Sequence, residues 1–108
     1  MVGKIFRVLF SSKSRDQLKD ITDYQRRNAS ASVAAKTRKA IREEAQKLEK
    51  LPSSRPIYPG TEDMDGEIRY AKKWSYKIIF EVFNPKKLVQ ILTIRHDAED
   101  PEDILDDL

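Results

Sequence analysis

The sequence predicts an α+β domain in which an N-terminal strand and an antiparallel helical hairpin precede a three-stranded antiparallel meander. Two observations lead to this prediction. The stretch 66–96 contains two runs dense in β-branched and aromatic residues, 76–83 and 88–94, whereas residues 14–51 carry apolar positions at helical spacing. All 108 residues are assigned to one domain, because a chain of this length buries one core but not two.

The run 76–83 is expected to be a middle strand of the sheet, because both of its faces are at least partly apolar. One face would carry Tyr76, Ile78, Phe80 and Val82. The pair Asn84-Pro85 is a turn signal that joins this strand to the run 88–94. The preceding run 67–71 alternates charged and apolar residues, and a short link at 72–75 would let it pair antiparallel with the middle strand.

At the N-terminal end, residues 4–10 alternate as a strand, which we expect to join the meander as a fourth strand. Ser14 and Gln17 fit a capping box, in which side chains satisfy the free amides of a helix start. The first helix is therefore predicted to begin at this box and to end near Asn28.

A second helix is predicted from a cap at Ser30 or Ser32 to about Leu51, since Pro52 cannot continue a helix. Because only a few residues separate the two helices, they should form an antiparallel hairpin. Each helix can bury its apolar stripe only against its neighbour or the sheet.

Two segments leave alternatives open. Residues 52–65 form one long loop rich in Pro, Ser and carboxylates, which either follows an irregular path over the sheet or is mobile. Residues 97–108 carry seven carboxylates and no Lys or Arg. Pro101 is placed to start a short C-terminal helix that buries three apolar residues, and the alternative is a frayed acidic tail.

The charge is divided unevenly along the chain. Through Gly60 there are 14 Lys and Arg against 6 Asp and Glu, a net of +8, and from Thr61 onward 7 against 12, a net of −5. The positive excess in the first half favours an anionic partner, either nucleic acid or an acidic protein. A solvated helical surface is the alternative.

The composition also argues against several classes of protein. No apolar run approaches the roughly 20 residues of a membrane span, and no signal-peptide segment is recognisable, so we expect a cytoplasmic protein without a membrane partner. With no cysteine and one histidine, neither a disulfide framework nor a zinc cluster is expected, and no cofactor is predicted. The sequence contains no Gly-rich phosphate loop and no nucleophile elbow.

Basic and aromatic residues gather in and around the predicted strands, and they form the candidate site. The group comprises Arg69, Tyr70, Lys72, Lys73, Trp74, Tyr76, Lys77, Arg95 and His96. If the cations converge on one concave face they would bind a phosphate backbone, while the aromatic rings stack on bases. Alternatively, the cations edge the sheet and Trp74 and Tyr76 pack in the core. His96 would either move protons near neutral pH or bond a loop carbonyl.

Four stretches carry a resemblance that covers nearly the whole chain. They are FSSKSRDQLKDITDY, KLEKLP, EIRYAKKWSYKIIFEVF and VQILTIRHDAEDP. Together they resemble the RelE/ParE superfamily of type II toxin–antitoxin toxins. The resemblance implies the same order of elements, with Arg69, the run 76–80 and His96 at positions of the family motif.

The resemblance implies two different activities. RelE-like members cleave mRNA in the ribosomal A site with clustered Lys and Arg and a C-terminal Tyr or His, whereas ParE-like members inhibit DNA gyrase by binding. No tyrosine follows Tyr76. Asp97 and Glu99 follow His96 at positions where relatives carry basic residues, and these carboxylates would repel a phosphate backbone. Lys77 and Phe80 also replace an arginine and a tyrosine of the motif.

We therefore expect a ParE-like gyrase inhibitor, neutralised by a cognate antitoxin in a toxin–antitoxin hetero-oligomer. Its target-binding residues would be Lys72, Lys73, Trp74, Tyr76 and Arg95. The alternative is a ribosome-dependent mRNA endonuclease in which Arg69 and Lys77 stabilise phosphate charge and His96 transfers a proton. A basic RNA-binding domain without toxicity is a third possibility.

Overall fold

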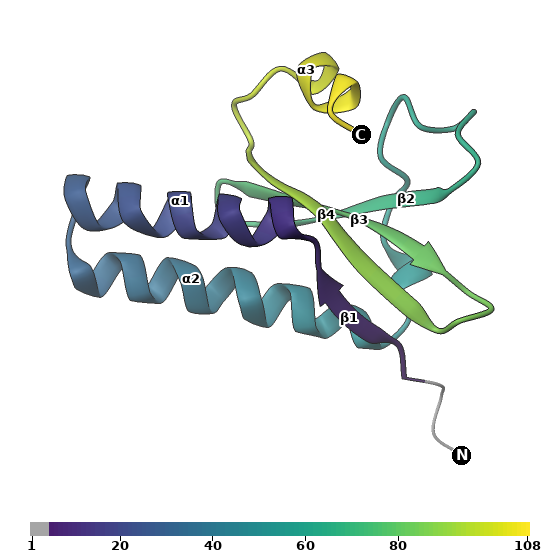
Figure 1. Ribbon diagram of the computed structural model, residues 1–108, viewed down its shortest axis with the longest axis horizontal. Helices are drawn as coiled ribbons and strands as arrows, with labels where there is room; N and C mark the ends of the chain where they lie inside the picture. The colour runs from purple at the N-terminus through teal and green to yellow at the C-terminus, as the bar shows by residue number, and fades with distance from the viewer. Residues whose placement is uncertain (1–4) are drawn as a thin grey trace.

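A helical hairpin lies across one face of a four-stranded sheet in the computed structural model, which describes residues 5–108 (Figure 1). The elements follow one another in the order β1 (Arg7–Phe10), α1 (Ser12–Asn28), α2 (Ala31–Gln46), β2 (Glu67–Lys73), β3 (Tyr76–Phe83), β4 (Leu88–His96) and α3 (Pro101–Asp106). This order confirms the predicted fold class. The predicted first strand begins at Arg7, and Lys4 lies outside the described residues.

The sheet has the order β1-β4-β3-β2, so β3 lies inside the sheet as predicted. Strands β2, β3 and β4 form the antiparallel meander, and β1 adds parallel to the outer side of β4. Ile78, Ile79 and Phe80 of β3 are each 0% exposed, although consecutive strand residues point to opposite faces. Both faces of the middle strand are therefore buried.

Two apolar clusters cover the two faces of the sheet. Beneath the hairpin, Ile41 and Leu48 pack with Ile78 and Phe80. A smaller cluster on the opposite face joins the loop before β2, the sheet and α3, and it contains Tyr58, Ile68, Ile79 and Ile104. The predicted C-terminal helix is thus docked, because Ile104 is 0% exposed. Within residues 5–108, no helix combines the length and the apolar character of a membrane span.

The predicted capping box at Ser14 is wrong. Helix α1 begins at Ser12, and Ser11 is its N-cap, whose hydroxyl accepts a hydrogen bond from the amide of Ser14. Gln17 instead reaches from α1 to β4, where its Oε1 accepts bonds from the Ile94 amide at 2.7 Å and the Thr93 hydroxyl at 3.0 Å. The register of β3 and β4 shifts beside these residues, and such a bulge leaves backbone groups for side chains to satisfy.

Helix α2 also ends earlier than predicted. Its N-cap is Ser30, one of the two expected residues, but the α-helix stops at Gln46 and is followed by a 3₁₀ turn at Lys47–Glu49. Leu51 then adopts φ +48°, the left-handed conformation. A residue before proline is disfavoured in the right-handed helical region, so Pro52 acts on the residues before it as well as on itself.

Glu44 ties α2 to the loop that follows it. Its Oε2 accepts a hydrogen bond from Arg55 at 3.0 Å and its Oε1 one from Lys47 at 3.3 Å, and its side chain is only 9% exposed. Burial acts to raise the pKa of Glu44, but the hydrogen bonds from Arg55 and Lys47 outweigh it, so the pKa lies below its ordinary value. The ionised form therefore stabilises the folded state.

We expect Glu44→Gln to lower the free energy of unfolding by about 1.5–3 kcal/mol at neutral pH, the range for hydrogen bonds to charged groups. Because the folded-state pKa is depressed, this contribution is complete above the ordinary glutamate pKa of about 4.3 and is lost as the pH falls through the folded-state pKa. Urea titrations at several pH values should show the two proteins converging in acid. The exposed neighbour Glu43 provides the control, Glu43→Gln, and a difference that persists in acid would contradict the role of Glu44.

Candidate functional site

Three of the predicted cations form a row on the sheet face opposite the hairpin. Lys72, Lys77 and Arg95 are in register across β2, β3 and β4, and residues paired in this way share a face. Ile79 lies two residues from Lys77 on the same face and belongs to the cluster beneath α3. These three of the predicted cations therefore converge on one face of the sheet, and we call them the cationic row.

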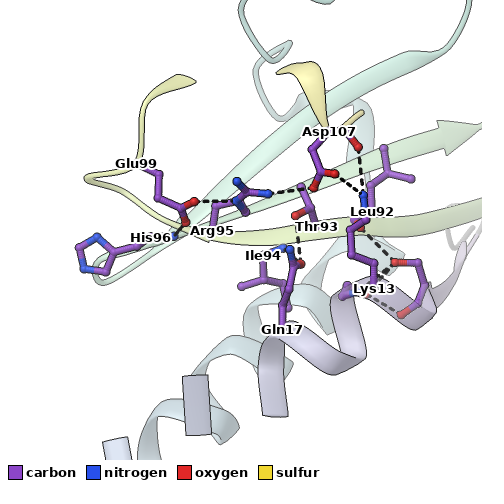
Figure 2. A network of polar contacts seen from close by, with 11 residues as sticks. Lys13, Gln17, Leu92, Thr93, Ile94, Arg95, His96, Glu99 and Asp107 are labelled. Carbon is purple, nitrogen blue, oxygen red and sulfur yellow. Dashed lines mark hydrogen bonds and ion pairs between the residues drawn. The ribbon is translucent and has the colours of Figure 1, made fainter. Parts of the chain in front are cut away.

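The cationic row is bound by carboxylates of the C-terminal segment. Lys72 and Lys77 both contact Asp97, at 3.1 and 3.4 Å. Arg95 lies between Glu99 and Asp107, with both distances 2.9 Å (Figure 2). The two carboxylates that follow His96 therefore act on the cationic row directly, as ion-pair partners.

Tyr76 and His96 occupy the opposite face at the same end of the sheet. Tyr76 is 8% exposed and belongs to the main core, where its hydroxyl accepts a hydrogen bond from Gln25 of α1 at 3.1 Å. The ring of His96 packs edge-on against it, with 5.6 Å between centroids. The ring of Tyr76 is therefore buried rather than free to stack on a base.

His96 is exposed, and its ring points away from the Arg95 network (Figure 2). Its Nδ1 accepts a hydrogen bond from the amide of Ala98 at 3.0 Å, so the neutral ring carries its proton on Nε2. The expected bond to a loop carbonyl is wrong, because the loop offers an amide donor at this place. With its proton on Nε2, the neutral imidazole can donate a hydrogen bond from that nitrogen.

Trp74 lies at the turn between β2 and β3, where it is 59% exposed and adopts φ +54°. The alternative expectation that Trp74 packs in the core is wrong. Since Lys73 pairs with Tyr76, only Trp74 and Ser75 form the turn, and a turn this short requires left-handed backbone. Positive φ is unfavourable for a bulky side chain, and strain of this kind often marks a binding position.

Arg69 is separated from the other predicted catalytic residues. It pairs with Phe80 of the main core, so it lies on the hairpin side of the sheet, whereas Lys77 lies on the opposite side. His96 is on the hairpin side but at the far end of the meander, in register with Tyr76. The structure therefore does not bring these three residues together.

Arg69 instead anchors the loop before β2. Its Nε donates to Glu67 and its Nη1 donates to the carbonyl of Arg55, each at 2.6 Å, and its side chain is 19% exposed. Ser53 and Asn84 donate to the same Glu67 carboxylate. This geometry is that of a structural arginine within a hydrogen-bonded network.

A groove that the sequence did not predict lies between β1 and the hairpin. Its volume is about 640 Å³, and its lining comprises Val8, Leu9, Phe10, Arg15, Leu18, Lys19, Thr22, Asp23, Arg26, Arg38 and Arg42. Apolar side chains form one part of this lining and arginines most of the rest. The spacing of Arg38 and Arg42, one helical turn apart, was the available signal, but which strand lies beside them is decided by the fold.

Comparison with solved structures identifies the class of protein to which this fold belongs. It is similar to the chromosomal ParDE toxin–antitoxin system from P. aeruginosa, with a TM-score of 0.69 and 21% identity over 85% of this chain and 96% of the other. It is also similar to the toxin–antitoxin complex RelBE2 from Mycobacterium tuberculosis, with a TM-score of 0.61 and 18% identity over 91% and 98% of the two chains. For the archaeal RelE–RelB complex from Pyrococcus horikoshii OT3 the TM-score is 0.58, with 15% identity over 89% and 99%. This is the ParE/RelE fold.

The sequence assigns the chain within that class. The model of the family described as ParE toxin of type II toxin–antitoxin system, parDE, matches residues 8–101. The chain therefore belongs to the ParE toxin family, and it is a type II toxin of the ParE/RelE superfamily. A search of curated protein sequences finds no match.

Proposed function

We propose that this toxin acts by binding DNA gyrase and needs no catalytic group. The supporting observation is the separation of Arg69, Lys77 and His96 over two faces of the sheet. General acid–base chemistry requires its groups within hydrogen-bond reach of one reacting centre. A binding mechanism has no such requirement, and the family match to ParE toxins favours it.

The turn between β2 and β3 is the proposed contact with the target. Trp74 projects there with 59% exposure, and the Lys73 ammonium lies 5.8 Å from the centre of its ring. Exposed tryptophans are frequent anchors of protein interfaces, and a neighbouring cation suits an acidic surface. Among the residues predicted to bind the target, Trp74 and Lys73 are the ones we retain for this contact.

The groove between β1 and the hairpin is the proposed site of an antitoxin, since the solved relatives are toxin–antitoxin complexes. Leu9 in this groove is 44% exposed, and β1 forms the edge of the sheet, to which an extended segment can add. The arginines of the lining favour an acidic partner segment with apolar residues. A toxin–antitoxin hetero-oligomer follows from this proposal.

Cleavage of mRNA is the alternative, favoured by the exposed imidazole of His96 with its proton on Nε2. In that mechanism His96 would transfer a proton at the end of β4, and cations of the sheet would stabilise phosphate charge. Two of the solved structures with this fold are RelBE complexes.

The decisive experiment is a supercoiling assay with purified protein, gyrase, ATP and relaxed plasmid. We expect dose-dependent inhibition, weakened strongly by Trp74→Ala and unchanged by His96→Gln, and expression in bacteria should cause growth arrest with an SOS response. Normal supercoiling together with cut ribosome-bound transcripts, lost in His96→Gln, would establish the alternative instead. Absence of both effects would leave the non-toxic RNA-binding domain.

A further inference from the structure

The acidic C-terminal segment, residues 97–108, covers the sheet face that carries the cationic row. Its helix α3 buries Ile104 against Tyr58, Ile68 and Ile79, and Leu105 and Leu108 pack around them. Figure 1 shows α3 next to the meander, on the side away from the α1–α2 hairpin. This face of the sheet is therefore covered by a segment of the same chain.

The carboxylates of the segment form ion pairs with the N–H donors of the cationic row. One carboxylate, Asp97, bridges Lys72 and Lys77, and two others hold Arg95 from both sides. Asp107 also contacts Lys13 of α1, at 2.9 Å (Figure 2). Ammonium and guanidinium groups bind phosphate oxygens with the same geometry, so a phosphodiester backbone would need the same donors.

These contacts also lower the pKa of two of the carboxylates. The hydrogen bond from Lys72, followed by the contact with Lys77, holds the pKa of Asp97 below its ordinary value. The hydrogen bond from Lys13, together with Arg95, does the same for the pKa of Asp107. Both carboxylates thus remain ionised over the physiological range and compete there with any other anion.

Part of what holds the segment is weak. The ion pairs of Lys13 and Lys72 are partly exposed to solvent, and exposed pairs are weak and screened by salt, whereas Lys77 and Arg95 are only 16% exposed. The hydroxyl of Tyr58, buried in the cluster beneath α3, has no hydrogen-bond partner among the described residues, and such a group disfavours the closed arrangement. Opening would hydrate this hydroxyl and free the cations.

We propose that residues 97–108 act as a built-in competitor that closes a phosphodiester-binding site formed by Lys72, Lys77 and Arg95. In the closed protein the carboxylates neutralise the site, and displacement of the segment exposes it. This regulation of the sheet face does not depend on whether the toxin inhibits gyrase or cleaves mRNA. Its test measures binding alone and requires no toxic activity.

The experiment compares two variants of the full chain that remove the same charge from the same segment. Asp97→Asn/Glu99→Gln/Asp107→Asn neutralises the three carboxylates that bind the row. Glu102→Gln/Asp103→Asn/Asp106→Asn neutralises three exposed carboxylates of α3 that do not. Amides retain the shape and an acceptor oxygen, and circular dichroism with thermal unfolding verifies that both variants are folded.

The probes are fluorescein-labelled single-stranded RNA and DNA of one sequence, about 20 nucleotides long, measured by fluorescence anisotropy. We expect the first variant to bind about tenfold more tightly than the second, with a slope of log K against log salt that is steeper by about 2, as three added phosphate contacts predict. Adding Lys72→Gln/Lys77→Gln to the first variant should abolish the gain. A preference between the RNA and DNA probes would show which backbone the row accepts.

Three outcomes would overturn the proposal. Equal gains in the two triple variants would mean that net charge alone causes the effect. A gain that survives loss of both lysines would place the binding elsewhere. No gain in either variant would show that the row does not bind phosphodiesters when its carboxylates are removed.

Discussion

Replacement of Phe80 by alanine is expected to lower the free energy of unfolding by about 3–5 kcal/mol, the range for removing a buried phenylalanine side chain. Phe80 is 0% exposed and lies in the main core between the sheet and the hairpin. Its removal deletes apolar contacts and leaves a cavity that a close-packed layer cannot fully collapse. Urea denaturation followed by circular dichroism measures the change.

Phe83, in the same strand, supplies the matched control because it is only partly buried. We expect Phe83→Ala to cost less than half as much as Phe80→Ala. Since domains of this size have only about 5–15 kcal/mol of stability, Phe80→Ala should also abolish growth arrest without touching a target contact. Equal losses in the two variants would contradict the position of Phe80 at the centre of the fold.

The second large effect is expected at Arg69. Arg69→Ala removes two short hydrogen bonds, one to the Glu67 carboxylate and one to the carbonyl of Arg55, and leaves both acceptors partly buried. Hydrogen bonds to charged groups contribute about 1.5–3 kcal/mol each, and we expect a loss of about 2–3 kcal/mol in the free energy of unfolding. Arg69→Lys should recover only part of it, because an ammonium cannot reproduce both directions of the guanidinium.

This prediction separates a structural arginine from a catalytic one. If Arg69 is structural, Arg69→Ala loses stability, and the fraction that remains folded at low temperature inhibits the target normally. Lys86→Ala, at an exposed position of the turn between β3 and β4, controls for the loss of one positive charge. A folded Arg69→Ala protein of unchanged stability but no activity would assign Arg69 to the chemistry instead.

Local patterns predicted the elements well but placed the cationic side chains poorly. The bounds of β3 agree with the predicted run 76–83, because β-branched and aromatic content and alternation are properties of consecutive residues. Lys72 and Lys73 were assigned to a link, whereas both belong to β2. Since neighbouring residues of a strand point to opposite faces, extending β2 by two residues separates Lys72 from Lys73.

The candidate site depended on contacts that sequence spacing does not reveal. Asp97 and Glu99 appeared as repulsive departures from a family motif, yet the structure uses them as partners of Lys72, Lys77 and Arg95. Arg69 matched a motif position but is held by the loop before β2. Apart from Glu99, which lies four residues after Arg95, the deciding partner in each case comes from another part of the fold.

By itself the sequence determined the order of elements, the buried middle strand and the family, because periodicity, turn residues and motif positions are local or positional. Only the tertiary structure decided which cations share a face, which carboxylates bind them and which aromatic ring is exposed. The physical reason is that these properties depend on strand register and on the docking of α3, and both arise from contacts between residues far apart in the chain.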